Sequence, residues 1–194
     1  MVCEAGVITE QLQNTALDNG LYYPVDFAST GSSQIGGNIA TNAGGIKVIR
    51  WGMTRDWVLG LKVVTANGEL LNLNQGLIKN ATGYDLRHLF VGSEGTLGLV
   101  VEATIRLTSR PGPLSVVLLA VPDMVDMISV LEAYRKVVTL TAFEFFSDNA
   151  MTTPTTIKNN KIEGTNTDGF GFGTAFFIYV VVNMSMVLGL VPIV

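Results

Sequence analysis

The chain has 194 residues, enough for one domain or for one domain and part of a second. A net charge of −4 and the lack of any basic run argue against a surface that binds nucleic acid. One cysteine, Cys3, and one histidine, His88, cannot form an intramolecular disulfide or a Cys/His zinc site. The N-terminus has no basic region followed by an apolar core and a cleavage site, so we expect a cytoplasmic protein.

The first elements expected along the chain are a strand and a helix. Residues 1–8 are apolar enough for a short strand. Thr9 then offers a hydroxyl for the N-cap of a helix, and Asn19-Gly20 is a typical helix end. Pro24-Val25-Asp26 leads from there, in extended form, into a glycine-rich stretch.

The glycine-rich stretch, Gln34 to Gly45, reads QIGGNIATNAGG and contains no acidic side chain. Glycine permits positive φ and a close approach of ligands, and successive exposed amides in turns suit phosphate oxygens. The side chains of Thr41 and Asn42 can donate to a phosphate or to a polar ring edge. A turn that only reverses the chain is the alternative reading. The candidate ligand-binding residues of this stretch are Gly36, Gly37, Thr41, Asn42, Gly44 and Gly45.

The next segment supplies two cations and a hairpin. Arg50 and Arg55 are candidate fixed cations for the proposed phosphate site, although ordinary surface charge or a pair with Asp56 would also explain them. Residues 58–66 and 69–73 predict two strands. Asn67-Gly68 between them favours a type I′ turn, so we assign the hairpin to the scaffold.

A second cluster, Lys79 to Val100, reads KNATGYDLRHLFVGSEGTLGLV. Asp85 is placed to cap a short helical turn that carries His88, and a lone histidine there is more often a packing residue than a catalytic one. Gly92 to Gly98 repeats glycine every third residue, which permits tight turns and close approach of a planar ligand. Plain turn geometry is again the alternative. The candidate ligand contacts of this cluster are Glu94, Gly95, Gly98 and Leu99.

Beyond this cluster the chain predicts a strand, a break and a β-α-β unit. Residues 99–107 alternate as a strand, and Ser109 to Pro113 is the clearest boundary in the chain. Residues 114–121 and 140–146 predict strands on either side of a helix capped by Pro122-Asp123. On the apolar face of that helix we expect Ile128, Leu131, Tyr134 and Val138.

Taken in order, Gln34–Gly45, Arg50–Leu71 and Lys79–Val100 resemble the FAD-binding domain of the vanillyl-alcohol-oxidase-type (PCMH-type) flavoproteins. Within that superfamily the chain is most similar to the FAD-linked D-2-hydroxyacid dehydrogenases, the D-2-hydroxyglutarate, D-lactate and glycolate oxidase group. The match covers about Val2 to Asn149. The chain contains no G-x-G-x-x-G and no G-x-x-x-x-G-K-[ST], so Rossmann-type and P-loop readings lack their signatures.

The resemblance implies an α+β fold of mixed sheets flanked by helices. Residues 1–109 would be a PCMH-type FAD-binding domain truncated at its beginning, and residues 110–149 the start of a ferredoxin-like substrate domain. The candidate residues above would contact FAD, which accepts a hydride at flavin N5 as a D-2-hydroxyacid is oxidised to a 2-oxoacid. Neither His88 nor Cys3 falls in a motif for covalent attachment, so we expect non-covalent FAD. The partners would be this small-molecule substrate and an electron acceptor that the sequence does not identify.

The substrate-binding, catalytic and metal-binding residues of the resembled family lie mainly in its C-terminal domain. We therefore assign no catalytic residue to this chain and expect no metal site in it. Two alternatives remain for its function: a non-catalytic fragment, or the FAD domain of another flavoenzyme of the same fold, such as the ether-lipid synthase.

Residues 150–194 do not match the family. Thr152 to Asp168 reads as a loop, residues 169–194 carry no charge, and Phe176 to Val182 is continuously apolar. A membrane span, two β-branched strands joined at Asn183-Met184-Ser185, and a translation frameshift would each explain this composition. We favour the frameshift and do not expect membrane insertion.

Overall fold

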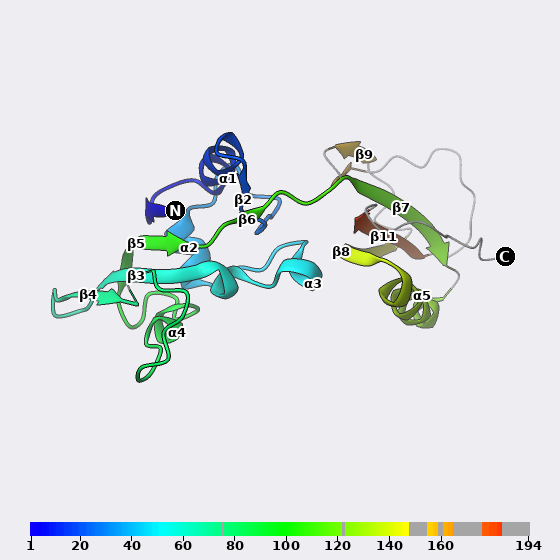
Figure 1. Cartoon of the computed structure of the whole chain (residues 1–194). Coiled ribbons are helices and arrows are strands. Elements are labelled where there is room, and N and C mark those ends of the chain that lie inside the picture. The colour runs from blue at the N-terminus through cyan, green and yellow to red at the C-terminus, as the bar shows by residue number, and fades with distance from the viewer. Residues whose placement is uncertain (75, 122, 148–154, 159–160, 165–175, 184–194) are drawn as a thin grey trace. The chain divides into compact units, whose positions relative to one another are not determined.

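The computed structural model describes the chain except residues 75, 122, 148–154, 159–160, 165–175 and 184–194. The chain divides into two compact units, residues 1–110 and residues 111–194 (Figure 1). Helices and antiparallel sheets occur in both units, which confirms the α+β class expected from the sequence.

A four-stranded antiparallel sheet in the order β1-β5-β3-β4 forms the centre of the first unit. Its strands are β1 (Val2–Glu4), β3 (Val58–Val64), β4 (Leu70–Leu73) and β5 (Leu99–Ile105). Val58, Leu61 and Val63 of β3 are buried, as the β-branched and aliphatic composition of this strand favours. This burial places β3 at the centre of the hydrophobic core.

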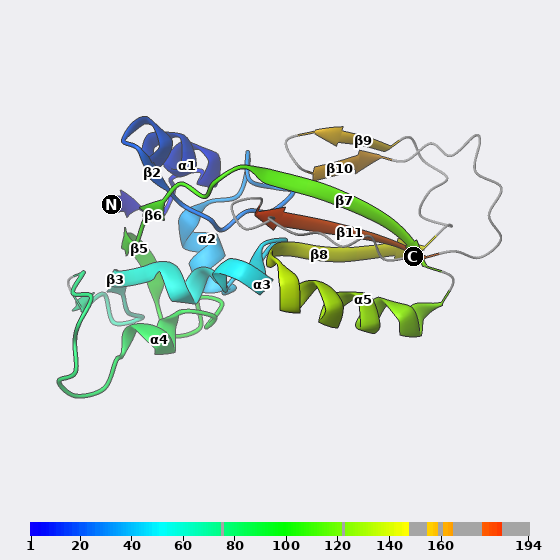
Figure 2. The ribbon, with the colours of Figure 1, turned by 45° about the vertical axis from the view of Figure 1, so that its right-hand side comes forward.

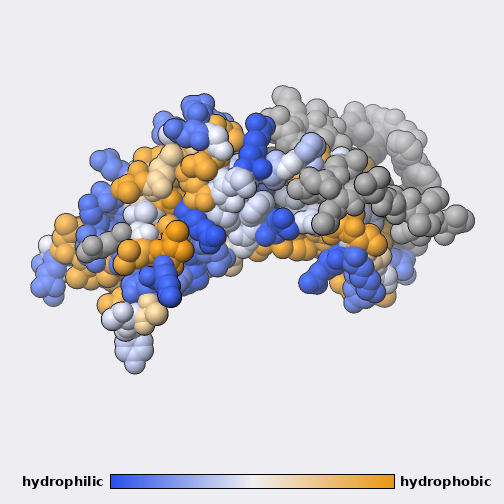
Figure 3. Space-filling model, viewed as in Figure 1, coloured by the Kyte–Doolittle hydropathy of each residue, from blue (hydrophilic) through white to orange (hydrophobic). Residues whose placement is uncertain are grey.

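Short helices and a second small sheet surround this sheet. They are α1 (Thr9–Asp18), α2 (Ile35–Ala40), α3 (Val48–Trp51), the 3-10 helix η1 (Thr54–Trp57), α4 (Arg87–Phe90), and the pair β2 (Leu21–Tyr22) with β6 (Thr108–Ser109). Figure 3 shows hydrophilic side chains over α1. Leu12 and Ala16 on the other side of α1 are buried, as expected for an amphipathic surface helix.

The start of the first unit differs from the prediction in two respects. β1 ends at Glu4, well before residue 8. Thr9 is the first helical residue and not the N-cap, which is Ile8. The hydroxyl of the fully buried Thr9 donates to the carbonyl of Ser33 at 3.0 Å, so it makes a tertiary contact instead of capping α1. The helix end was predicted correctly, because Asn19 is the C-cap and Gly20 has φ +70°.

The hairpin between β3 and β4 was predicted, but its turn type was wrong. A type I′ turn needs positive φ at both central residues, and only Gly68 (φ +79°) has it in this loop. The amide of Gly68 donates to the carbonyl of Thr65 at 2.9 Å, and the amide of Thr65 donates to the carbonyl of Glu69 at 2.9 Å. The loop is thus one residue longer than expected, with the left-handed conformation confined to its glycine.

A three-stranded sheet in the order β7-β11-β8 forms the centre of the second unit. Its elements are β7 (Leu114–Val121), α5 (Met124–Val137), β8 (Thr139–Ser147), the hairpin β9 (Thr155–Lys158) and β10 (Lys161–Gly164), and β11 (Phe176–Asn183). β11 is antiparallel to both of its neighbours, so β7 and β8 run parallel to each other and α5 connects them. Figure 2 shows α5 along one face of this sheet, a split β-α-β arrangement typical of ferredoxin-like folds.

The core of the second unit corrects one predicted residue. Ile128, expected on the apolar face of the helix, is 60% exposed, whereas the preceding Met127 is buried. Leu131, Tyr134 and Val138 pack against the same core, as predicted. The apolar stripe therefore passes through residue 127, one position away from the predicted start.

The apolar segment of residues 176–182 is a β-strand in the structure, β11. Ile178, Val180 and Val182 on this strand are buried against the α5 side of the sheet. The second strand that the two-strand explanation requires would begin in residues 184–194, outside the described residues. None of the helices in the described part of the chain is both long and apolar enough to cross a membrane. The frameshift stays a hypothesis.

Candidate functional site

The glycine-rich stretch is a helix followed by a turn, which corrects the expectation of turns throughout it. α2 covers Ile35–Ala40, so Gly36 and Gly37 lie inside a helix. Ile35 and Ile39 are fully buried, and these two apolar anchors hold the helix against the core. The carboxamide of the buried Asn38 donates to the hydroxyl of Thr9 at 2.7 Å, which fixes α2 to α1.

The second glycine-rich segment joins the C-terminal end of α2. The amide of Gly92 donates to the carbonyl of Ile39 at 3.0 Å, and the amide of Glu94 donates to the carbonyl of Ala40 at 2.9 Å. The last carbonyls of a helix have no partner within the helix, so these two amides satisfy them. The two motifs, far apart in the sequence, therefore form one structure.

A cavity of about 370 Å³ opens where these segments meet β1 and β5. Its walls come from the turn after β1, from α2, from the turn after α4 and from the start of β5. The residues that line it are Ala5, Gly6, Gln34, Gly36, Gly37, Ala40, Phe90, Ser93, Glu94, Gly95, Gly98, Leu99 and Val100. Such a volume is in the range of ligand pockets.

The four predicted glycines of the cavity differ in what they permit. A Cβ on Gly36 would lie 2.6 Å from Cβ of Ala5, and a Cβ on Gly98 would lie 2.7 Å from Cγ1 of Val63. These two glycines are needed for packing. A Cβ on Gly37 or on Gly95 would meet nothing within 4 Å, so here the missing side chain leaves backbone open to a ligand.

Six of the candidate residues predicted from the sequence line the cavity, and four do not. The six are Gly36, Gly37, Glu94, Gly95, Gly98 and Leu99. Of the other four, Thr41 donates its hydroxyl to the carbonyl of Gly37 at 3.0 Å, and the side-chain oxygen of Asn42 accepts from the amide of Arg55 at 3.0 Å. Both side chains hold the turn after α2, and their contact with a cofactor stays a prediction.

Gly44 and Gly45 also lie in this turn and have structural reasons to be glycine. A Cβ on Gly44 would lie 2.8 Å from Cγ2 of Val48. Gly45 has φ +84° and pairs in a parallel bridge with Asp26, whose carbonyl oxygen a Cβ would strike. Cofactor contact by these glycines is likewise untested.

Seven lining residues were not among the predicted contacts: Ala5, Gly6, Gln34, Ala40, Phe90, Ser93 and Val100. Most of them lie within the two quoted motifs, so those motifs were the sequence signal that could have identified them. No local sequence pattern indicated that Ala5 and Gly6 would line the cavity. They reach the cavity because the amide of Gly36 donates to the carbonyl of Ala5 at 2.8 Å and the amide of Ala5 donates to Val101 at 2.9 Å.

Arg55 has a structural role: it is neither an ordinary surface charge nor, among the described residues, paired with an acidic neighbour. Its guanidinium donates to the carbonyl of His88 at 2.9 Å, to the carbonyl of Val91, and to Nδ1 of His88 at 3.1 Å. Because arginine can only donate, Nδ1 of His88 accepts and its proton lies on Nε2. Arg55 thereby fixes α4 and the turn that follows it. Arg50 instead lies over the ring of Trp51, 5.2 Å from its centroid.

Asp85 does not cap α4, in contrast to the prediction, because the N-cap is Leu86 and no side chain caps it. Both carboxylate oxygens of Asp85 accept from Nε of Arg87 at 2.9 Å. These hydrogen bonds from Arg87 lower the pKa of Asp85. His88 is not among the residues that line the cavity.

Cys3 is the one thiol of the chain, and it is partly buried. Burial raises the pKa of Cys3 to about 11, so its thiol stays protonated at neutral pH. In the described parts of the chain no three His, Cys, Asp or Glu side chains come together as metal ligands would.

Comparison with known proteins agrees with this geometry. Residues 1–74 match the family model described as FAD binding domain. The D-2-hydroxyglutarate dehydrogenase of Stutzerimonas stutzeri (strain A1501) is 66% identical over 150 residues, which are 77% of this chain and 32% of that protein. The mitochondrial D-2-hydroxyglutarate dehydrogenase of Bos taurus is 41% identical over 153 residues, 78% of this chain and 28% of that protein.

Among solved structures, an alkyldihydroxyacetonephosphate synthase superposes with a TM-score of 0.72 at 20% identity, over 93% of this chain and 35% of that chain. This likeness shows a shared fold. The fold and the matched domain define a flavoprotein with an FAD-binding domain of the PCMH type. The chain is similar to FAD-linked D-2-hydroxyacid dehydrogenases over about three quarters of its length, 77% and 78%, and it spans about a third of the length of the curated relatives that it matches first, 32% in each case.

Proposed function

We propose that the chain is the cofactor-binding portion of an FAD-dependent oxidoreductase that oxidises a D-2-hydroxyacid to a 2-oxoacid. The relatives named D-2-hydroxyglutarate dehydrogenase, 66% and 59% identical, support this class of substrate. They make D-2-hydroxyglutarate the first compound to test. Non-covalent attachment, the absence of a metal site and a cytoplasmic location remain predictions.

The observation that carries the proposal is the cavity at the junction of the two motifs. Gly37 and Gly95 leave backbone open there, and Phe90, Leu99 and Val100 supply apolar walls. A flat ring system with few polar contacts is what such a lining fits. Cys3 and His88, the residue types that attach flavins covalently, are not among the lining residues, which supports non-covalent binding.

The residues of this chain would bind and orient the cofactor. The amides of Gly92 and Glu94 fix the turn against α2, which would pre-organise this wall of the cavity for a ligand. The apolar walls would keep water from the bound ring. FAD, when bound, supplies the acceptor for the hydride from the α-carbon of the substrate.

Reconstitution with FAD tests the proposal directly. The purified chain is mixed with excess FAD, passed through a desalting column, and its visible spectrum is recorded. A retained and shifted flavin spectrum is expected, and complete loss of flavin would refute cofactor binding by this chain. Anaerobic addition of D-2-hydroxyglutarate then tests the reaction: bleaching supports catalysis by the chain, whereas an unchanged spectrum restricts it to binding the cofactor.

A further inference from the structure

Arg55 holds the segment of the chain that forms one wall of the cavity. Its guanidinium donates to the carbonyl of His88 at 2.9 Å and to the carbonyl of Val91. Residue 90, between these two carbonyls, lines the cavity, and residues 93–95 shortly after them line it as well. Because α4 is only four residues long and has no side-chain cap, such tertiary contacts determine where it lies. The position of this wall therefore depends on Arg55.

The ring of His88 makes a further contact with the same guanidinium. Nη1 of Arg55 lies 3.1 Å from Nδ1 of His88, and this ring nitrogen accepts, because a guanidinium has no acceptor. The side chain of His88 is 39% exposed, so protons of the solvent can reach it. A proton on Nδ1 would replace the acceptor by a donor and would place a second positive charge against Arg55.

The charged groups around His88 act differently on its two ring nitrogens. Nε2 lies 3.5 Å from Oδ2 of Asp85, an attraction that favours the protonated ring. Arg87 donates to both oxygens of the same carboxylate and offsets part of its charge. On η1, the carboxylate of Asp56 makes no ion pair with Arg55 in the described part of the chain. On the side of Nδ1, the guanidinium would therefore face the protonated ring without a carboxylate between them.

Histidine is the side chain that ordinarily takes up a proton between about pH 8 and pH 5. We propose that Arg55 and His88 together position this wall of the cavity, and that proton uptake by His88 loosens the wall and weakens the binding of FAD. The inference rests on the proposed binding of FAD. His88 acts here as a positioning residue, since it does not line the cavity.

The affinity for FAD at about pH 7.5 and at about pH 5.5 tests the inference on the full chain. Equilibrium dialysis gives the dissociation constants of wild type, H88N, H88F and E69Q, and thermal unfolding at both pH values shows whether each variant is folded. Asparagine keeps an acceptor close to the position of Nδ1 but takes up no proton, whereas phenylalanine keeps a ring and has no acceptor.

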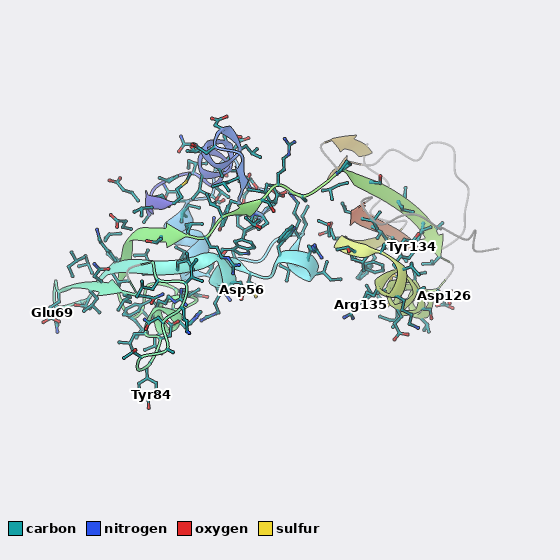
Figure 4. The ribbon with its side chains drawn as sticks, in the orientation of Figure 1. Asp56, Glu69, Tyr84, Asp126, Tyr134 and Arg135 are labelled. Atoms are coloured by element: carbon teal, nitrogen blue, oxygen red, sulfur yellow. The ribbon has the colours of Figure 1, made fainter. Side chains whose placement is uncertain are left out.

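E69Q is the matched control for acid titration elsewhere in the chain. It removes a titratable carboxylate from Glu69, an exposed residue that points away from the first unit in Figure 4 and does not line the cavity. Its response to pH should equal that of wild type.

Wild type and E69Q should bind FAD about fivefold or more weakly at the lower pH, a coupling of the size usual between two linked sites. The affinity of H88N should change by about twofold or less, and H88F should bind FAD more weakly than H88N at the higher pH, because it lacks the acceptor.

The pH dependence of wild type and H88N alone decides the inference, even where H88F does not fold. If wild type binds FAD with no loss at the lower pH, or if H88N loses as much affinity as wild type, the inference is wrong and the proposed function stands. If wild type does not bind FAD at the higher pH, the proposed function fails, and the inference with it.

Discussion

Nζ of Lys47 lies 2.9 Å from Oδ2 of Asp26, and the two side chains are only 19% and 10% exposed. The hydroxyl of Tyr22 accepts a second hydrogen bond from Nζ at 3.0 Å, and Oδ1 of Asp26 accepts from Thr30 at 3.0 Å. This pair joins the segment before the glycine-rich stretch to the start of α3. The pair therefore links the segments before and after the glycine-rich stretch, and it supports the turn after α2.

Asp26→Asn should lower the free energy of unfolding by about 2–3 kcal/mol, because it leaves the mostly buried Lys47 without a counter-ion. The matched control is E102Q, which breaks the more exposed Lys62–Glu102 pair and should cost about 1 kcal/mol or less. Urea unfolding at neutral pH measures both. Equal effects of the two variants would contradict the prediction.

The same pair predicts a pH dependence. Burial alone would lower the pKa of Lys47, but Tyr22 and Asp26 outweigh it and raise the pKa above the ordinary 10.5. The contribution of the pair is therefore complete below 10.5 and is lost as pH rises through the higher pKa of the folded state. The stability difference between wild type and D26N should be constant near neutral pH and shrink in strongly alkaline solution. A difference that grows with alkaline pH would contradict this sign.

Gly45→Ala should destabilise the chain far more than Gly68→Ala. Both glycines have positive φ, +84° and +79°, so both variants carry backbone strain of about 1–2 kcal/mol. Only at Gly45 would the new Cβ strike a backbone atom, the carbonyl oxygen of Asp26, whereas at Gly68 it meets nothing within 4 Å. We expect a loss of about 3 kcal/mol or more for G45A, measured by urea unfolding. Similar midpoints for the two variants would show that the turn yields easily.

Gly37→Ala should weaken FAD binding by about tenfold or more without destabilising the chain. Replacement of a helical glycine by alanine stabilises a helix by up to about 1 kcal/mol. At this position no atom of the chain lies within 4 Å of the new methyl group, which would occupy space in the cavity. Thr15→Ala, on helix α1 and outside the cavity, should change FAD affinity by about threefold or less. Retained flavin absorbance and thermal unfolding without FAD give the two readouts. Unchanged flavin retention by G37A would contradict the prediction.

Cys3 should react slowly with thiol reagents. Its pKa is raised from 9.0 to about 11, so near pH 8 its thiolate fraction is about 100-fold smaller than that of an ordinary cysteine. As the only cysteine of the chain, it gives a direct signal with a chromogenic disulfide reagent. The chain unfolded in urea is the control and should react about 100-fold faster. A fast reaction of the folded chain would show that β1 separates readily from β5.

Signals from residues adjacent in sequence predicted the helices, the strands and the break in the chain better than they predicted tertiary contacts. The helix end at Gly20 and the break near Pro111 depend on residues adjacent in sequence, and the structure has both. The stripe of α5 was misplaced to Ile128 because periodicity alone does not fix which side of the helix meets a sheet. The turn at Asn67-Gly68 was misjudged because two loop lengths share the same dipeptide.

The candidate site shows the same limit more sharply. Gly36 and Gly37 are identical neighbours in sequence and both line the cavity, yet a Cβ on Gly36 would strike Ala5 and one on Gly37 would meet nothing within 4 Å. The direction in which a missing Cβ would point is a property of the folded chain. The partners of Arg55 are likewise two backbone carbonyls and a ring nitrogen, which no sequence pattern specifies.

The position of β11 has a consequence for the order of events during synthesis. β7 and β8 make their ladders to β11 and not to each other, although β11 is the last of the three to be made. The large sheet of the first unit is complete once Ile105 has left the ribosome, whereas this one must wait for residues 176–183. Until then a nascent chain carries two strands with unpaired edges, which invite pairing with another molecule.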